Sequence, residues 1–200
     1  MSLKERRAEQ SEQTIARLVE VATALFVKKG YAKVTIGELS KAAKMTSGAI
    51  YHHFEDKLAL FERVAETITE ELVAKAQSKL SAHADPWLRL CAGIDAVLEA
   101  SGTPKVKLAF IEAPAVLGLD KWRRIEQQKT APLLQASLEG LVRSGALTVE
   151  RATLLAPTLR GMIVEAAMAV AESKTPEKVR PELSKMIQTM VLSLSRPPAP

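Results

Sequence analysis

Apolar residues recur along this chain at intervals of three and four, the spacing of one face of an α-helix. The first such face lies in residues 11–29 and is followed by Gly30, which is typical of a helix end. Its apolar positions are Ile15, Leu18, Val19, Ala22, Leu25 and Phe26. Residues 1–10 are polar and slightly basic, and we expect them to form an arm before the first helix.

The same spacing continues through the rest of the chain and predicts an all-α protein of about nine helices. After residues 11–29, helices are expected near residues 35–43, 46–54, 56–80, 86–101, 104–117, 120–144, 148–171 and 177–195. Pro114 should kink or end the sixth helix, and Pro132 should interrupt or kink the seventh, because proline removes a helix hydrogen bond.

The segment 34–54 has the form of two short helices joined by a tight turn. Residues 35–38 match a capping box, with Thr at the cap and Glu three positions later. Residues 44–45 form the predicted turn, and residue 46 or 47 caps the second helix. This arrangement predicts a helix-turn-helix that reads DNA.

The second of these helices carries small, hydroxylated and aromatic residues on one face, which suits contact with DNA. Hydroxyls near a helix N-terminus attract phosphate, small residues allow close approach to base edges, and an alanine can touch a thymine methyl. Ile50 and Phe54 should face inward and hold the helix in place. The residues with these roles, including a cation at the start of the next helix, are Thr46, Ser47, Gly48, Ala49, Tyr51, His52 and Lys57.

Composition and charge agree with a nucleic-acid contact near the N-terminus and argue against several other classes. The net charge is +5, and residues 1–57 carry 10 Lys/Arg against 7 Asp/Glu. Cys91 is the one cysteine, so an internal disulfide and a cysteine-based zinc site are excluded. Neither a signal peptide nor a membrane span is evident, and we expect a cytoplasmic protein with no membrane partner.

Enzymatic chemistry finds no support in the sequence. We see no paired carboxylates beside a histidine, no glycine-rich phosphate loop and no nucleophile with its base. The adjacent His52 and His53 cannot both face one metal from a helix. We therefore expect neither catalysis nor a metal or cofactor, and a purely structural helical adaptor would leave the face of the second short helix unexplained.

The N-terminal quarter resembles the tetracycline-repressor (TetR) family. The resemblance covers about residues 11–61 and rests on Phe26-Val27-Lys28-Lys29-Gly30-Tyr31, Val34-Thr35 and Ser47-Gly48-Ala49-Ile50-Tyr51-His52-His53-Phe54-Glu55-Asp56-Lys57. It implies a one-component transcription regulator, with Thr35 added to the DNA-contacting residues and Tyr51, His52 and Lys57 mostly on phosphate or sugar. On this basis we divide the chain into a DNA-binding domain at 11–57, whose last helix continues to about residue 80, and a ligand-binding and dimerisation domain at 58–195.

Two positions depart from the family pattern. Lys44 stands where the family usually has a glycine with positive φ, at a cost of up to about 1 kcal/mol, and its cation could reach a phosphate. Gly37 lies inside a helix, which costs roughly 1 kcal/mol against alanine.

The remaining helices resemble the family only in outline, with residues 110–118, Trp122 and Arg123 resembling one subgroup. Large or soft residues on the middle helices are candidates for a ligand pocket, although any single one of them is more often plain core. They are Trp87, Leu90, Cys91, Phe110, Pro114, Leu117, Trp122, Met162, Glu165 and Met168. Glu165 is the sharpest candidate, because a carboxylate among apolar neighbours needs a partner such as Arg160 or a polar ligand group.

The last two helices are the expected dimer interface, since an apolar stripe beside an Ala/Gly-rich helix favours close packing against a second copy. The candidates are Met168, Leu183, Met186, Ile187, Met190 and Leu194. The alternative is that both stripes close the core of the single chain. The sequence thus predicts a ligand-responsive dimeric repressor with a palindromic operator and an unknown small-molecule effector; the alternatives are an activator or a ligand-independent regulator.

Overall fold

The computed structural model describes residues 3–195, and these residues are helical from one end to the other. The helices are α1 (Leu3–Lys29), α2 (Ile36–Ala43), α3 (Ser47–His53), α4 (Lys57–Leu80), α5 (Pro86–Ser101), α6 (Pro104–Lys107), η1 (Leu108–Glu112), α7 (Ala113–Leu117), α8 (Leu119–Arg143), α9 (Val149–Glu172) and α10 (Pro176–Ser195). Since α6, η1 and α7 run on without a break, the described residues form nine helical segments. The predicted all-α fold and number of helices are confirmed.

Two expectations about helix boundaries are corrected. The predicted arm at residues 1–10 is wrong for its described part, because α1 already begins at Leu3. Pro132 does not interrupt its helix, since α8 is continuous from Leu119 to Arg143. Residues 1–2 of the arm lie outside the described residues.

The helix changes its hydrogen-bond pattern in the turn that precedes Pro114. The backbone between Leu108 and Glu112 is a π-helix, and the Ala113 N–H donates to the Leu108 carbonyl five residues back. Because Pro114 has no N–H, the ordinary hydrogen-bond ladder cannot continue through it, and a π-turn is one of the ways in which a helix absorbs such a break. The hydrogen bonds of the segment therefore change to the π-helical pattern at η1, and the helix then continues to Leu117.

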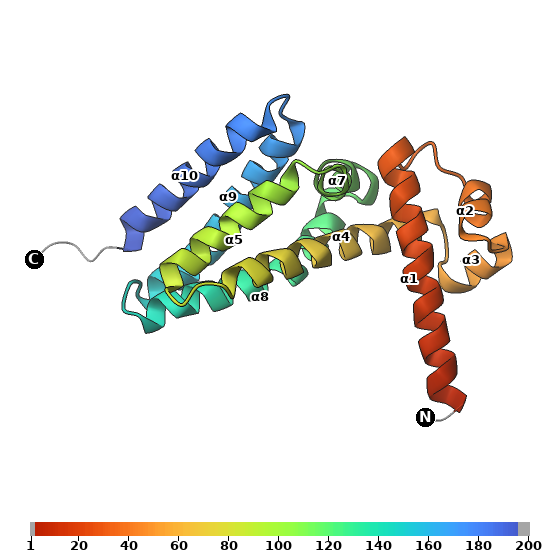
Figure 1. The fold of residues 1–200 in the computed structure, drawn as a ribbon, viewed down its shortest axis with the longest axis horizontal. Helices are drawn as coiled ribbons and strands as arrows, with labels where there is room; N and C mark the ends of the chain where they lie inside the picture. Colours follow the sequence, from red (N-terminus) through yellow and green to blue (C-terminus); the bar gives the residue numbers. More distant parts are fainter. Residues whose placement is uncertain (1–2, 196–200) are drawn as a thin grey trace, which may run out of the picture.

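The chain is arranged as an N-terminal head on a longer helical bundle (Figure 1). Helices α1, α2 and α3 form the head, and α1 packs on both α2 and α4. Helix α4 leads out of the head along the bundle, where it contacts α5 and α8. Helices α9 and α10 pack on each other and on α5 at the end of the molecule away from the head.

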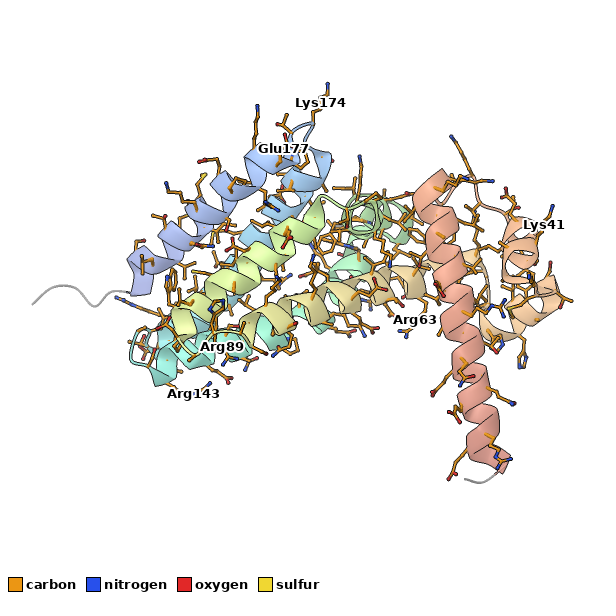
Figure 2. All side chains as sticks on the ribbon, in the orientation of Figure 1. Lys41, Arg63, Arg89, Arg143, Lys174 and Glu177 are labelled. Carbon is orange, nitrogen blue, oxygen red and sulfur yellow. The ribbon has the colours of Figure 1, made fainter. Side chains whose placement is uncertain are left out.

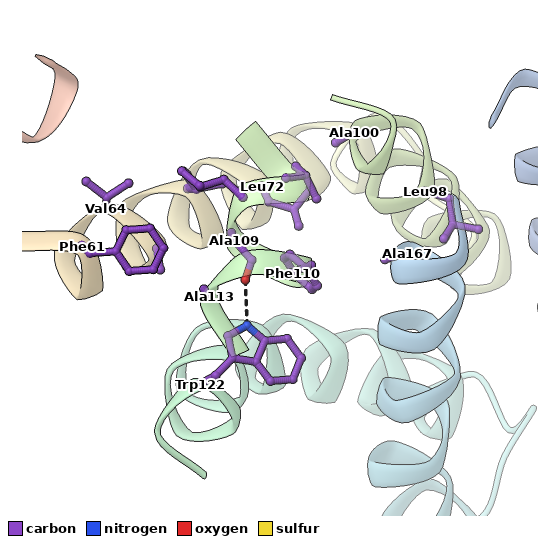
Figure 3. Packing of buried hydrophobic residues seen from close by; sticks show 14 of the residues in the cluster. Phe61, Val64, Leu72, Leu98, Ala100, Ala109, Phe110, Ala113, Trp122 and Ala167 are labelled. Atoms are coloured by element: carbon purple, nitrogen blue, oxygen red, sulfur yellow. Dashed lines mark hydrogen bonds between the residues drawn. The ribbon is translucent and has the colours of Figure 1, made fainter. Parts of the chain in front are cut away.

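One continuous apolar core runs from the head into the bundle. In the head, the rings of Phe26 and Phe61 meet edge to face with centroids 5.1 Å apart, and Tyr31 lies 4.8 Å from Phe61. Figure 3 shows the continuation, in which Phe61 and Leu72 of α4 face the segment that carries Ala109 and Phe110. Burial of this apolar surface is the main force that holds the head and the bundle together.

Among the described helices, α9 has the length and composition of a membrane span. In the structure it packs against α5, α8 and α10, and 28% of its most apolar stretch is buried within the single chain. Its charged Arg151 and Arg160 reach other helices, by bonds to the Leu194 carbonyl and to Glu126 respectively.

Candidate DNA-binding surface and effector cavity

The predicted capping box at the start of α2 is present. The Glu38 N–H donates to the Thr35 hydroxyl oxygen at 3.2 Å, and the Thr35 N–H donates to the Glu38 carboxylate at 3.0 Å. Lys29 at the end of α1 also binds this carboxylate at 2.5 Å. The Lys29 and Thr35 bonds favour the ionised form and lower the pKa of Glu38 to about 2. The end of α1 and the start of α2 are therefore tied at one carboxylate.

The turn between α2 and α3 depends on Lys44. This residue has φ 55° and ψ 43°, and among the described residues it alone has positive φ without being glycine. The left-handed conformation expected from the family pattern is therefore kept despite the lysine side chain. The Lys44 side chain is exposed, so its cation is accessible from solvent.

Helix α3 is fixed at its start and buried along one side. The Ala49 N–H donates to the Thr46 hydroxyl oxygen at 3.1 Å, which makes Thr46 the cap, and the Ser47 hydroxyl lies 3.1 Å from that of Ser40 on α2. Ile50 is 1% exposed and anchors the helix, as expected. The opposite side presents Ser47, Gly48, Tyr51 and His52 to solvent.

Gly48 is not required by the packing of the protein. A Cβ at this position would lie 3.9 Å from the Thr46 hydroxyl, an ordinary contact, and its φ is not positive. The same holds for Gly37, whose added Cβ would lie 3.9 Å from the Thr35 hydroxyl. The bare backbone at Gly48 is thus free for a partner that approaches α3 closely.

The structure gives Lys57 a role inside the head. Its ammonium donates to the carbonyls of Tyr31 and Val34 at 3.0 and 2.9 Å, and it lies 4.1 Å from the centre of the Tyr31 ring. Two of its three N–H groups are therefore occupied by the loop between α1 and α2. Only the third N–H group of Lys57 remains for the phosphate contact that the sequence predicted. Lys41 of α2, by contrast, is exposed and projects outward from the head (Figure 2).

A cavity of about 80 Å³ lies inside the bundle, between α4, α5, α8 and α9. Most of its wall is apolar, and four lining residues carry polar groups: Glu126, Thr130, Ser137 and Arg160. The apolar lining consists of Leu72, Val73, Ala76, Leu80, Leu90, Gly93, Ile94, Val97, Phe110, Leu133, Leu134, Ile163 and Val164. A mainly apolar space with a few convergent polar groups is the usual form of a small-molecule site.

The buried carboxylate of this cavity is Glu126, and the prediction for Glu165 is wrong. Glu165 is exposed, whereas Glu126 is 2% exposed and paired with Arg160. The Thr130 hydroxyl donates to the second Glu126 oxygen at 2.7 Å. A signal was present in the sequence, because Glu126 lies four residues after Trp122 and four before Thr130 on the inward stripe of α8.

Two of the other pocket candidates line this cavity, and the rest lie outside it. Phe110 and Leu90 line the cavity, whereas the remaining candidates do not. Trp122 is core: its indole N–H donates to the Ala109 carbonyl at 2.8 Å and its ring meets Phe110 edge to face (Figure 3). The others outside the lining are Trp87, Cys91, Pro114, Leu117, Met162, Glu165 and Met168.

The dimer-interface candidates separate into two groups. Ile187 is 5% exposed and belongs to the core of the single chain, so its assignment to an interface is corrected. Met168 and Leu183 are half-buried against that core. Met186, Met190 and Leu194 are 53, 49 and 51% exposed, and Leu154 on α9, which the sequence did not single out, is 74% exposed.

The head and the bundle are also joined by a polar contact. A carboxylate oxygen of Glu112, at the end of η1, accepts from the Tyr31 N–H at 2.5 Å. Gly30, with φ +77°, lies beside the same carboxylate, and a Cβ there would be 3.3 Å from it. The turn after α1 therefore rests on the π-helical segment whose Phe110 lines the cavity.

The described helices and the exposed face of α3 define the class of protein: a helix-turn-helix DNA-binding protein with a helical C-terminal domain. Residues 18–64 match the family model described as bacterial regulatory proteins, tetR family, and residues 87–194 match that of the tetracyclin repressor-like C-terminal domain. The chain belongs to the tetracycline-repressor family of transcription regulators, which are typically repressors.

Individual relatives agree with this assignment. The chain is 33% identical to the HTH-type transcriptional regulator AcrR of Shigella flexneri over 107 residues, which is 52% of this chain and about half (49%) of that protein. A TetR-family regulator from Pectobacterium atrosepticum has a similar structure, with TM-score 0.81, 27% identity and coverage of 96 and 98% of the two chains. The structure of RolR with resorcinol has TM-score 0.70 at 21% identity, over 96 and 98% of the chains, and shows the shared fold.

Proposed function

We propose that this protein is a ligand-responsive homodimeric repressor that binds a palindromic operator. The observation that carries the DNA contact is the outer face of α3, where Ser47, Gly48 and Tyr51 are exposed while Ile50 anchors the helix. Neither the packing nor the backbone conformation of the protein requires a glycine at position 48. Absence of a side chain there is explained by close approach of the helix to base edges.

Few long side chains are available on this face for direct reading of bases. Phosphate contacts should therefore supply much of the affinity, from the start of α3 and from exposed cations such as Lys44. Specificity should depend on Ser47, Ala49 and Tyr51 and on the distance between two heads. Two half-sites one helical turn of DNA apart, about 34 Å, require a dimer.

The exposed apolar residues of α9 and α10 support the dimer. Leu154, Met186, Met190 and Leu194 are each about half exposed or more in the single chain. Exposed apolar side chains on two neighbouring helices are costly in water and are removed from it when a second copy packs against them. The expected arrangement is a bundle of two helices from each protomer.

Effector response requires that the cavity and the heads be connected. Helix α4 lines the cavity with Leu72 and Val73 and begins inside the head at Lys57. The second connection is η1, which carries Phe110 at the cavity and Glu112 on the Tyr31 N–H. An effector that favours another position of these two elements would shift the heads from the spacing that fits the operator. RolR, of the same fold, was solved with the ligand resorcinol, which agrees with a small-molecule effector.

The substitution Gly48→Leu tests the DNA contact. A Cβ at this exposed position makes only an ordinary contact, and leucine favours helix, so folding should be retained. Fluorescence anisotropy with the DNA upstream of its own coding sequence should show at least about tenfold weaker binding, a loss of about 1.4 kcal/mol. Ala74→Leu adds bulk at an exposed position of α4, about 25 Å along the helix from Lys57, and should bind normally.

Equal binding by Gly48→Leu and wild type would contradict the placement of α3 against DNA. Saturable wild-type binding that weakens with salt would support the proposal, and its absence at low salt would reject it. An activator would bind in the same way, so transcription of neighbouring genes after deletion of this gene decides between the two.

A further inference from the structure

Glu126 is an acidic side chain placed deep in the bundle, on the wall of the cavity. It is 2% exposed, and both of its oxygens accept hydrogen bonds, one from the Thr130 hydroxyl at 2.7 Å and one from the Arg160 guanidinium. Burial of a single charge would be strongly unfavourable, and the opposite charge of Arg160 compensates for it. The polar part of the wall is thus a pair with no net charge.

The pair retains hydrogen-bonding capacity for a ligand. A carboxylate offers about four acceptor positions, of which two are used, and a guanidinium has five N–H groups, of which one meets Glu126. In the described part of the chain no other protein group bonds to Arg160. The other two polar residues of the wall are committed, because the Thr130 hydroxyl donates to Glu126 and the Ser137 hydroxyl donates to the Leu133 carbonyl.

A ligand with a charge of its own would leave water for a site without a counter-charge. An anion would meet Glu126 beside Arg160, and a cation would meet Arg160 beside Glu126, so each would lose hydration without full compensation. A hydroxyl or carbonyl group meets no such penalty, since it can donate to Glu126 or accept from Arg160. The other lining residues are apolar and match a hydrocarbon ring or chain.

From these contacts we propose that the cavity binds a small, uncharged, mainly apolar molecule with one hydroxyl or carbonyl group, and that the Glu126–Arg160 pair is its specificity determinant. The free volume of about 80 Å³ is about half that of the dry cavity of about 150 Å³ that takes benzene, so the ligand is no larger than roughly a single ring or short chain, and a ring enters only with small movements of the lining side chains. The role of this molecule as an effector rests on the proposed function; its binding does not.

Four probes with one ring and different polar groups test the proposal: benzyl alcohol, benzoate, benzylammonium and toluene. Isothermal titration calorimetry of the full-length protein should show benzyl alcohol binding about 2- to 10-fold more tightly than toluene, the value of one net hydrogen bond. Benzoate and benzylammonium should bind at least about tenfold more weakly than benzyl alcohol. Binding of either ion or of toluene as tightly as benzyl alcohol would overturn the proposal. Failure of all four probes to bind at millimolar concentration would also overturn it.

Glu126→Gln changes the charge of the site with almost no change in shape. It leaves Arg160 without a counter-charge, and the preference should turn towards benzoate, by at least about tenfold relative to benzyl alcohol. A plain packing role for Glu126 would weaken all four probes alike. The double variant Glu126→Leu with Arg160→Met removes the pair and should bind toluene as well as benzyl alcohol. Far-UV circular dichroism establishes that each variant is folded.

Operator binding separates this inference from the proposed function. Wild-type protein that binds its operator but none of the probes would reject the ligand class alone. Wild-type protein that binds benzyl alcohol but no operator DNA would reject the repressor and leave the ligand class standing. Release of operator DNA by benzyl alcohol, and not by benzoate, would support both the ligand class and the repressor function.

Discussion

Glu112 and Tyr31 lie 81 positions apart in the sequence and are joined by a hydrogen bond of 2.5 Å, from the Tyr31 backbone N–H to the Glu112 carboxylate. The bond fastens the turn after α1 to the end of a π-helical segment. Backbone groups in turns have no helix partner, and a carboxylate acceptor makes a stronger bond than a neutral one. The position of the head on the bundle therefore depends on this one side chain as well as on apolar packing.

Glu112→Ala should lower the free energy of unfolding by about 1–3 kcal/mol, because it removes a charged acceptor from a half-buried N–H. It should also weaken the effect of an effector on operator affinity. Urea unfolding measures the first effect and anisotropy titrations with and without effector measure the second. Glu66→Ala, which removes a partly exposed ion pair with Arg63 within α4, is the control and should cost less than about 1 kcal/mol. An equal cost of the two variants would contradict the role of Glu112.

Lys44→Gly should raise the free energy of unfolding by up to about 1 kcal/mol, because glycine adopts positive φ without the steric cost of a Cβ. Lys44→Ala keeps the Cβ and should give no such gain. Both variants lose the cation, so each should reduce the salt dependence of operator binding by about one phosphate contact. A gain in stability from alanine as large as that from glycine would contradict strain at this turn.

The lowered pKa of Glu38 predicts that the stability of the protein decreases at low pH. Its pKa is lowered to about 2 from an ordinary 4.5, first by the Lys29 bond, so its contribution is present above pH 4.5 and is lost as the pH falls from 4.5 towards 2. The difference in unfolding free energy between wild type and Glu38→Gln should shrink over this interval. Lys29→Met should reduce the pH dependence of the unfolding free energy that Glu38 contributes. A difference that stays constant with pH would contradict the contact.

Cys91 should react slowly with iodoacetamide. Its burial, with smaller contributions from Asp95 and Asp85, raises the pKa of the thiol to about 11 from 9.0. At pH 8 the thiolate fraction falls by about 100-fold, and higher intrinsic nucleophilicity recovers about tenfold of this. The native rate should thus be at least about tenfold below that in 6 M guanidinium chloride, as measured by mass spectrometry. Equal rates would show that the thiol is not desolvated.

Met190→Lys should convert the proposed dimer into monomer at micromolar concentration, because it places a charge in an apolar contact of α10. Sedimentation velocity gives the mass of each species. Leu119→Lys changes an equally exposed apolar residue at the start of α8 and should leave the assembly unchanged. Dimerisation by both variants would place the interface elsewhere.

Helix ends were predictable from the sequence where the signal is local. Thr35, Thr46 and Asp56 cap α2, α3 and α4 through bonds to N–H groups three residues later, and Lys44 has the left-handed backbone that its place in the turn indicated. These contacts involve neighbours in the chain, so residue type and spacing suffice to predict them. The face of α3 followed from the same short-range pattern.

Which charged groups are buried depends on the packing of helices that lie far apart in the chain. Glu165 and Glu126 both stand in helices with apolar neighbours, yet Glu165 is exposed and Glu126 meets Arg160 from another helix. Periodicity shows that a helix has an apolar face, but the gap left between packed helices depends on the shapes of four of them together. Lys57 likewise offers a free cation in the sequence and in the fold binds two carbonyls of the α1–α2 loop. Local residue patterns thus account for most of the helices and for the exposed face of α3, whereas long-range packing determined the cavity and the joint between head and bundle.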